Sequence, residues 1–158
     1  MRLLTFAFLS CAAFATVSSA NAATRIDDPV SFVGHVYENL RKNHGYTTPA
    51  DIYSPRLAAL FAADRKETGT APPIFGRLDF DFWLDAQDTD DGMPGTVKVT
   101  GIDVPNAPDR KVVDVTFTNF DPKENRFYFE KTPAGWKLDD VSSPSQGWTL
   151  SLILKYGR

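Results

Sequence analysis

The sequence predicts an α+β domain in which N-terminal helices pack on a curved four-stranded antiparallel sheet. Apolar residues recur at helical spacing within residues 28–64, and from Thr96 onward they alternate with polar residues at a period of two. The segments between the alternating stretches are rich in Pro, Gly, Asn and Asp, and they are too short for the crossover helices that parallel strands need. The strands are therefore expected to form an antiparallel meander.

The helices are predicted first along the chain. One helix covers residues 28–45, because Asp28 can cap its N-terminus and Pro29 is favoured in its first turn. A single turn follows at residues 48–51, and a second helix, opened by a Ser-Pro pair, runs over residues 54–64. The first half of the chain after residue 27 is thus expected to be helical.

The strands are predicted in the second half. The period-two pattern places them at residues 97–104, 111–120, 126–131 and 136–141. Residues 148–156 are predicted to form a closing helix, with an edge strand as the alternative.

Residues 1–22 have the three-part pattern of a secretory signal peptide, with a positive start, an apolar run and the ending Ala20-Asn21-Ala22. The apolar run is shorter than the about 20 residues that cross a bilayer as a helix. We expect a mature chain of residues 23–158 that forms one domain, is periplasmic or secreted, and has no membrane insertion after leader cleavage. Lipid attachment at Cys11 is disfavoured because Leu9 stands two positions before it, and without Cys11 the mature chain has no cysteine.

The charge pattern excludes some partners. The formal net charge is −3 at pH 7, and the basic residues occur as scattered pairs. Nucleic acids and anionic membranes are bound through clustered Lys and Arg, which this chain does not have. We therefore expect no nucleic-acid partner.

Three segments carry a family resemblance: Ser54-Pro55-Arg56-Leu57, residues 78–88, and residues 135–141. Helices followed by a bent antiparallel sheet with these segments resemble the nuclear-transport-factor-2-like (cystatin-like) superfamily. Within it, the chain looks like a group of small secreted bacterial domains of unknown function. The resemblance implies a cone-shaped fold, homodimerisation through the exposed sheet face, and no catalytic motif that can be transferred.

Polar chemistry concentrates in residues 79–91, which we call the acidic segment because six aspartates alternate there with aromatic residues. One interpretation is a contact surface in which aromatic side chains ringed by acids anchor a basic partner. The other is that the aromatics pack on the core while the aspartates accept backbone hydrogen bonds or face water. The candidate binding residues are Asp79, Asp81, Trp83, Asp85, Gln87 and Asp88.

Crowded carboxylates also suggest a hard cation, with calcium as the candidate and Asp85, Asp88 and Asp90 as the candidate ligands. The spacing does not fit a calcium-binding EF-hand, because the turn glycine and the closing glutamate of that loop would fall on Met93 and Val99. If calcium binds, excess calcium raises the melting temperature, because a ligand of the folded state stabilises it. An unchanged melt in excess calcium and in chelator would remove the hypothesis.

Catalysis is not predicted, and no catalytic residue is assigned. Relatives of this superfamily that resemble ketosteroid isomerase place an acid in an apolar cavity. The apolar phase of the strands here contains no acid or histidine; it consists of Val113, Val115, Phe117, Phe127, Phe129, Trp136 and Leu138. Trp136 is assigned to the core. His35 is expected on the surface of the first helix, and His44 is expected in the last turn of that helix.

These observations favour a secreted or periplasmic binding module that is not an enzyme and that contacts a protein or a small ligand in the cell envelope. A concrete form is an inhibitor of, or an immunity protein against, a cell-envelope enzyme. The alternative is a small-ligand-binding protein or an isomerase- or hydrolase-like enzyme with a pocket in the concave side of the sheet.

Overall fold

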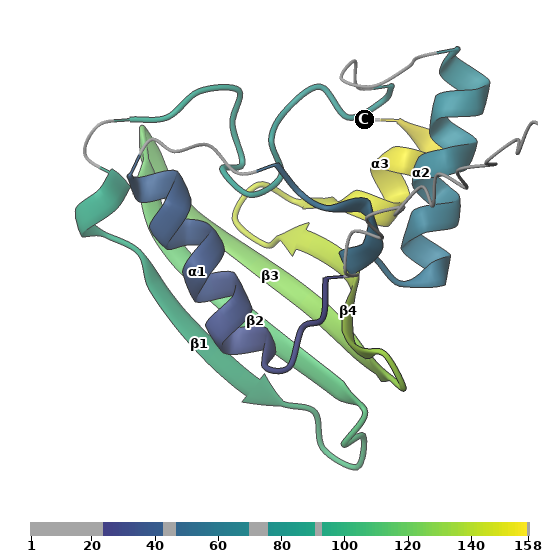
Figure 1. Ribbon diagram of the computed structural model, residues 1–158. Helices are drawn as coiled ribbons and strands as arrows, with labels where there is room; N and C mark the ends of the chain where they lie inside the picture. The colour runs from purple at the N-terminus through teal and green to yellow at the C-terminus, as the bar shows by residue number, and fades with distance from the viewer. Residues whose placement is uncertain (1–23, 43–46, 70–75, 91–92, 158) are drawn as a thin grey trace, which may run out of the picture.

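The computed structural model describes residues 24–42, 47–69, 76–90 and 93–157 (Figure 1). The predicted leader, His44, Gly45 and Asp91 lie outside these residues. Within them, three α-helices and a five-stranded antiparallel sheet form an α+β fold. Among the described helices, none combines the length and the apolar character that crossing a membrane requires.

The first helix, α1 (Pro29–Arg41), begins where the sequence predicts it. The Asp28 carboxylate accepts a hydrogen bond from the Ser31 amide at 2.7 Å, which caps the helix. One face of α1 is buried at Val33, Val36, Tyr37 and Leu40. Figure 1 shows α1 lying across one face of the sheet, so this apolar stripe forms one half of the core.

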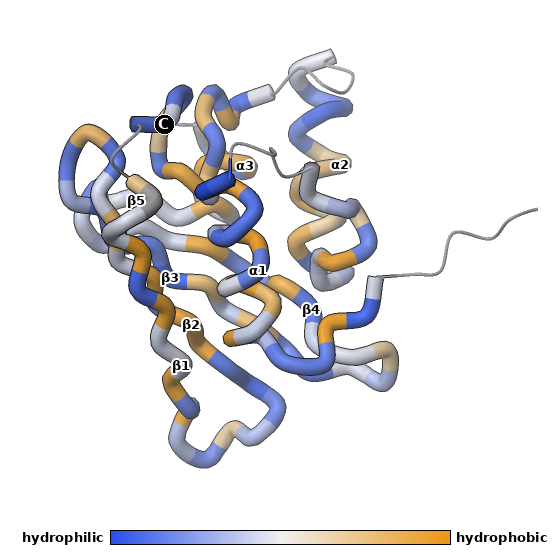
Figure 2. The backbone as a smooth tube through the Cα atoms, turned by 60° about the vertical axis from the view of Figure 1, so that its left-hand side comes forward, coloured by the Kyte–Doolittle hydropathy of each residue, from blue (hydrophilic) through white to orange (hydrophobic). Residues whose placement is uncertain are grey.

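The second helical region also begins as predicted. A 3₁₀ turn, η1 (Ala50–Ile52), leads into α2 (Pro55–Thr68), whose N-cap Ser54 accepts a hydrogen bond from the Leu57 amide. The helix ends at Gly69, whose φ of +66° is the left-handed conformation typical of a C-terminal glycine. Hydrophilic residues gather in the C-terminal half of α2 (Figure 2), which explains why only Leu57 and Asp64 of this helix are buried.

After a second 3₁₀ turn, η2 (Met93–Gly95), the strands follow in chain order, and each pairs antiparallel with the next. The predicted meander is therefore confirmed. The strands are β1 (Lys98–Asp103), β2 (Arg110–Asn119), β3 (Asp121–Thr132), β4 (Gly135–Ser143) and β5 (Trp148–Thr149).

Two features of the sheet correct the prediction. Residues 121–124, expected as a separator, pair with β2 and belong to β3. The sheet has five strands instead of four, because the chain turns back after Ser143 and pairs two residues with β4 before entering α3 (Leu150–Tyr156). The closing helix is confirmed, but it places a helix at the C-terminal end of a fold whose helices were expected to be N-terminal.

The inward face of the sheet is filled with apolar side chains. Five predicted inward residues are at most 3% exposed, namely Val113, Val115, Phe117, Phe127 and Phe129. An irregularity in the pairing after Tyr128 sets Leu138 opposite Phe129, so that Leu138 also points inward. The core thus fills the space between α1 and the sheet.

Candidate binding surface

Two buried amide side chains hold the acidic segment against the sheet. Asn119 is 0% exposed; its Nδ2 donates to the carbonyls of Leu84 and Asp88, at 3.2 and 3.0 Å, and its Oδ1 accepts from the Asp90 amide at 2.7 Å. Asn125 Nδ2 donates to the carbonyls of Phe82 and Trp83. Asn119 and Asn125 lie on the same inward face of β2 and β3 as the apolar core residues. This end of the core is therefore polar, and it binds backbone groups of the segment.

The aromatic residues of the segment pack in the core, as the second interpretation of this segment predicts. Phe80, Phe82 and Leu84 are buried, and Trp83 is 1% exposed. The Trp83 ring stacks on Phe127 with 4.7 Å between centroids. In this conformation Trp83, one of the candidate binding residues, contributes to packing and not to the surface.

Two of the candidate aspartates are engaged inside the protein. Asp85 accepts hydrogen bonds from Trp148 Nε1 at 2.5 Å and from Ser143 Oγ at 2.8 Å. Asp81 accepts from the Trp83 amide at 2.8 Å, and burial raises the pKa of its carboxyl group. Both carboxylates therefore organise the segment and the end of β4.

The remaining candidate residues, Asp79, Gln87 and Asp88, are exposed. Gln87 Nε2 donates to the backbone carbonyl of Asp79 at 2.9 Å, and the Asp88 carbonyl is held by Asn119 beside the turn between β2 and β3. Within the described ranges, no three His, Cys, Asp or Glu side chains are grouped so that they could hold a metal ion. Calcium binding stays a prediction from the sequence.

Phe120, at the turn between β2 and β3, is the surface residue that the sequence analysis missed. Asn119 pairs with Asp121, so Phe120 alone forms the tip of the hairpin. It has a φ of +61° and is 62% exposed. A bulky residue in the left-handed region is an outlier, because its Cβ crowds the following carbonyl.

A signal for this tip was present in the sequence. Asn-Phe-Asp-Pro, residues 119–122, contains turn-forming residues around the aromatic one. Through Asn119, the tip lies beside the exposed end of the acidic segment. We define the Phe120 surface as Asp79, Gln87, Asp88, Phe120 and Asp121, all of them exposed.

Comparison with protein-family models and with curated proteins found no match. Among solved structures, a chain of the native type VI effector–immunity complex Tae3–Tai3 from Ralstonia pickettii matches with a TM-score of 0.46 and 18% identity, covering 75% of this chain and 94% of that chain. A chain of the selenomethionine form of that complex matches with a TM-score of 0.44 and 17% identity, covering 73% of this chain and 92% of that chain. Likeness of this degree assigns neither a family nor a function to this chain.

We predict that Asp81→Asn stabilises the protein at neutral pH. Burial raises the folded-state pKa of Asp81 above its unfolded value, so the charged carboxylate disfavours folding above that pKa and the penalty disappears as the pH falls through it. Asparagine keeps an oxygen to accept from the Trp83 amide and removes the charge. Urea unfolding at pH 7 and pH 3 measures the difference.

The gain in unfolding free energy should be largest at pH 7 and close to zero at pH 3. Asp79→Asn, on the exposed side of the same segment, should change stability little at either pH. An Asp81→Asn variant that is less stable than wild type at pH 7 would contradict the conclusion that burial of this charged carboxylate costs stability.

Proposed function

We propose that this protein is a secreted, periplasmic binding module that docks on a protein partner through the Phe120 surface. The observation that carries the proposal is a large aromatic side chain that is both conformationally strained and exposed. A binding role explains why such a residue occupies a hairpin tip.

The strain at Phe120 has no compensation in packing. A non-glycine residue in the left-handed region costs roughly 1–2 kcal/mol. Phe120 is 62% exposed and is not among the residues that pack on the core, so core packing does not explain this conformation. Strained residues of this kind cluster at ligand contacts and switch regions, where function retains them.

The chemistry of the surface indicates the kind of partner. Exposed aromatic residues are frequent binding anchors, because they bury a large apolar area when a partner covers them. Asp121 follows Phe120 in the chain and the Asp88 carbonyl is held by Asn119, so the exposed side chains of both aspartates belong to this end of the sheet. A partner with a basic rim around an apolar recess would complement this surface, and its association would weaken with salt.

The interior supports binding in preference to catalysis. Apolar side chains and the two amides occupy the inward positions of β2 and β3. The buried carboxylates among the described residues serve as hydrogen-bond acceptors: Asp85 as given above, and Asp64 for the Arg77 amide. His35 is exposed on α1. A general acid or base needs a position facing a substrate space; Asp64 and Asp85 are engaged in structural hydrogen bonds, and His35 lies on the outer surface of α1.

The predicted leader indicates the compartment in which this role would be carried out, the cell envelope. In the cell envelope, a small module that docks on one protein suits the inhibition of, or immunity to, a cell-envelope enzyme. The nuclear-transport-factor-2-like assignment and a homodimer through the exposed sheet face remain expectations of the resemblance, to be tested by the oligomeric state in solution.

We predict that Phe120→Gly increases stability and removes partner binding. Glycine adopts the left-handed conformation without penalty, so the unfolding free energy should rise by about 1 kcal/mol. Wild-type protein immobilised at low salt should retain a partner from periplasmic extract, and the glycine variant should not. Urea unfolding and the recovered partner, identified by mass spectrometry, are the two measurements.

The matched control is Leu152→Ala, which removes another exposed apolar side chain, on α3, at 55% exposure. This variant should keep the partner. Equal retention of the partner by wild type and Phe120→Gly would refute the proposed surface, and failure of wild type to retain any protein at low salt would refute the binding function.

A further inference from the structure

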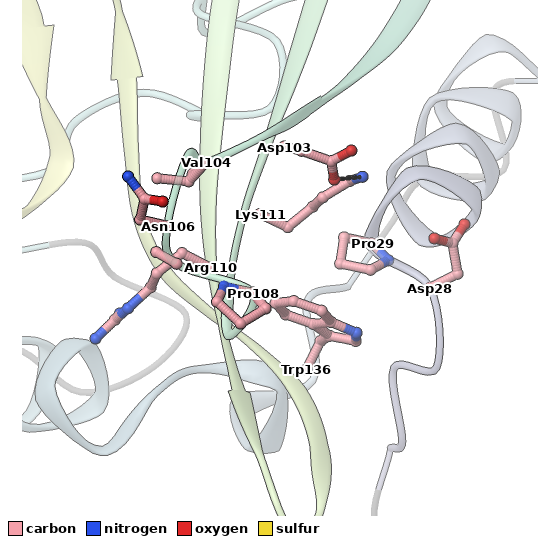
Figure 3. A pocket seen from close by; sticks show the side chains of 10 residues that line it. Asp28, Pro29, Asp103, Val104, Asn106, Pro108, Arg110, Lys111 and Trp136 are labelled. Carbon is pink, nitrogen blue, oxygen red and sulfur yellow. Dashed lines mark hydrogen bonds and ion pairs between the residues drawn. The ribbon is translucent and has the colours of Figure 1, made fainter.

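A hollow of about 390 Å³ opens at the far end of β2 from Phe120 (Figure 3). It lies between the start of α1, the loop that joins β1 to β2, and the start of β4. Its size falls in the range of small-molecule sites. Its location differs from the concave pocket considered from the sequence, because the space between α1 and the sheet is filled.

Trp136 is the aromatic residue that lines the hollow, and Pro29 and Pro108 extend this apolar wall (Figure 3). Its side chain packs against the core but is only partly buried, so the assignment of Trp136 to the core is confirmed in part. The other two tryptophans, Trp83 and Trp148, are 1% and 6% exposed. The physical reason is that Trp136 is the second residue of β4, at the edge of the core, where its amide donates to the carbonyl of Ile26 just before α1.

The loop that closes the hollow is built before any ligand arrives. The Ala107 amide donates to the Val104 carbonyl at 3.1 Å, the Arg110 amide donates to the Ala107 carbonyl at 3.0 Å, and Asn106 takes a φ of +60°, which asparagine tolerates. The Asp109 carbonyl accepts from the Lys131 amide at 2.8 Å, which ties the loop to β3. A preformed site loses little entropy on binding.

The two basic side chains on the walls of the hollow are held in ion pairs. Lys111 Nζ is 2.6 Å from Asp103 Oδ1, and Arg110 Nη1 is 3.0 Å from Glu130 Oε2. Asp28 caps α1, and its hydrogen bonds with Ser31 lower the pKa of its carboxyl group. With Asp28, Asp103, Arg110 and Lys111 on its walls, the hollow has no net charge.

This arrangement disfavours ionic ligands. The Lys131 ammonium, from outside the hollow, is 5.6 Å from the centroid of the Trp136 ring, so an ammonium ligand would meet a ring that already interacts with a cation. An anion would meet Arg110 and Lys111 only in ion pairs with Glu130 and Asp103, and it would also face the carboxylate of Asp28. A neutral ligand with one apolar face and a rim of hydrogen-bonding groups fits best.

We propose that this hollow binds the ring of a neutral saccharide. The C–H face of a pyranose matches the apolar face of Trp136, and its hydroxyl groups both donate and accept. Asp103, whose side chain is 93% exposed, can accept from such hydroxyls, and the Asn106 amide and Arg110 guanidinium can donate to them. A proline-rich peptide also packs on tryptophan, but its proline residues offer no backbone N–H donors to the carboxylates.

The proposal is independent of the Phe120 surface, which lies at the other end of β2. Trp136 is the most exposed of the three tryptophans and lines the hollow, so its fluorescence reports occupancy of the hollow. The probes are triacetylchitotriose, cellotriose and mannotriose, titrated into the full mature chain up to millimolar concentration and measured by tryptophan emission and calorimetry. At least one should bind, shift the emission and protect the indole from acrylamide quenching.

Variants test the assignment to the hollow. Trp136→Ala should weaken binding by at least about tenfold, which corresponds to about 1.4 kcal/mol, and Trp136→Phe should retain most of the affinity measured by calorimetry. Asp103→Asn, at an exposed position that leaves folding intact, should weaken binding severalfold. Phe120→Gly should bind the saccharide as wild type does, which separates this proposal from the proposed function.

Three outcomes overturn the proposal. They are the absence of binding for all three saccharides at millimolar concentration, saccharide binding that Trp136→Ala and Asp103→Asn leave unchanged, and binding of a polyproline decapeptide in place of the saccharides with the same protection of Trp136.

Discussion

The hydrogen bonds that two buried amides make to an irregular loop determine the shape of this protein's surface. A segment outside helices and strands must still satisfy its backbone polar groups where it is buried. Asn119 and Asn125 do so for residues 82–90, and the same contacts compensate the cost of burying the amides. Asn125 Oδ1 has no partner among the described residues, so this arrangement carries one unpaired acceptor.

The amides also divide the acidic segment into a packed side and an exposed side. Trp83 stacks on Phe127 and Asp85 receives the Trp148 indole N–H, so these residues stabilise the fold. Asp88 stays in solvent beside the hairpin tip at Phe120. Without the contacts of Asn119, neither the tip nor the exposed carboxylates would be held in a fixed relation, and a preorganised docking surface would not exist.

Much of the fold could be predicted because its signals are local. Asp28 and Ser54 cap the helices that their spacing predicts, and the period of two places Val113, Val115 and Phe117 on one face. The edge strand within residues 148–156 was predicted only as an alternative to the helix, because its two residues pair only after the chain reverses at Gly147, and so short a segment has no period.

The candidate surface was harder to predict, because exposure depends on contacts between distant residues. Trp83 and Trp136 have equally apolar side chains, and their roles differ only because Asn125 and Phe127 draw Trp83 inward while Trp136 lies where α1 begins. Phe120 is exposed because Asn119 pairs with Asp121, so the residue between them lies at the hairpin tip and not on either face of the sheet.

Amide hydrogen exchange of wild-type protein tests the central constraint most directly. The Asp90 amide, which donates to Asn119 Oδ1, should exchange slowly, with protection comparable to that of neighbouring amides in β2, and Asn119→Ala should make it exchange freely while the centre of β3 stays protected. An Asp90 amide that exchanges in wild type at the rate of an unstructured peptide would show that the buried amide does not hold the segment, and would contradict the account.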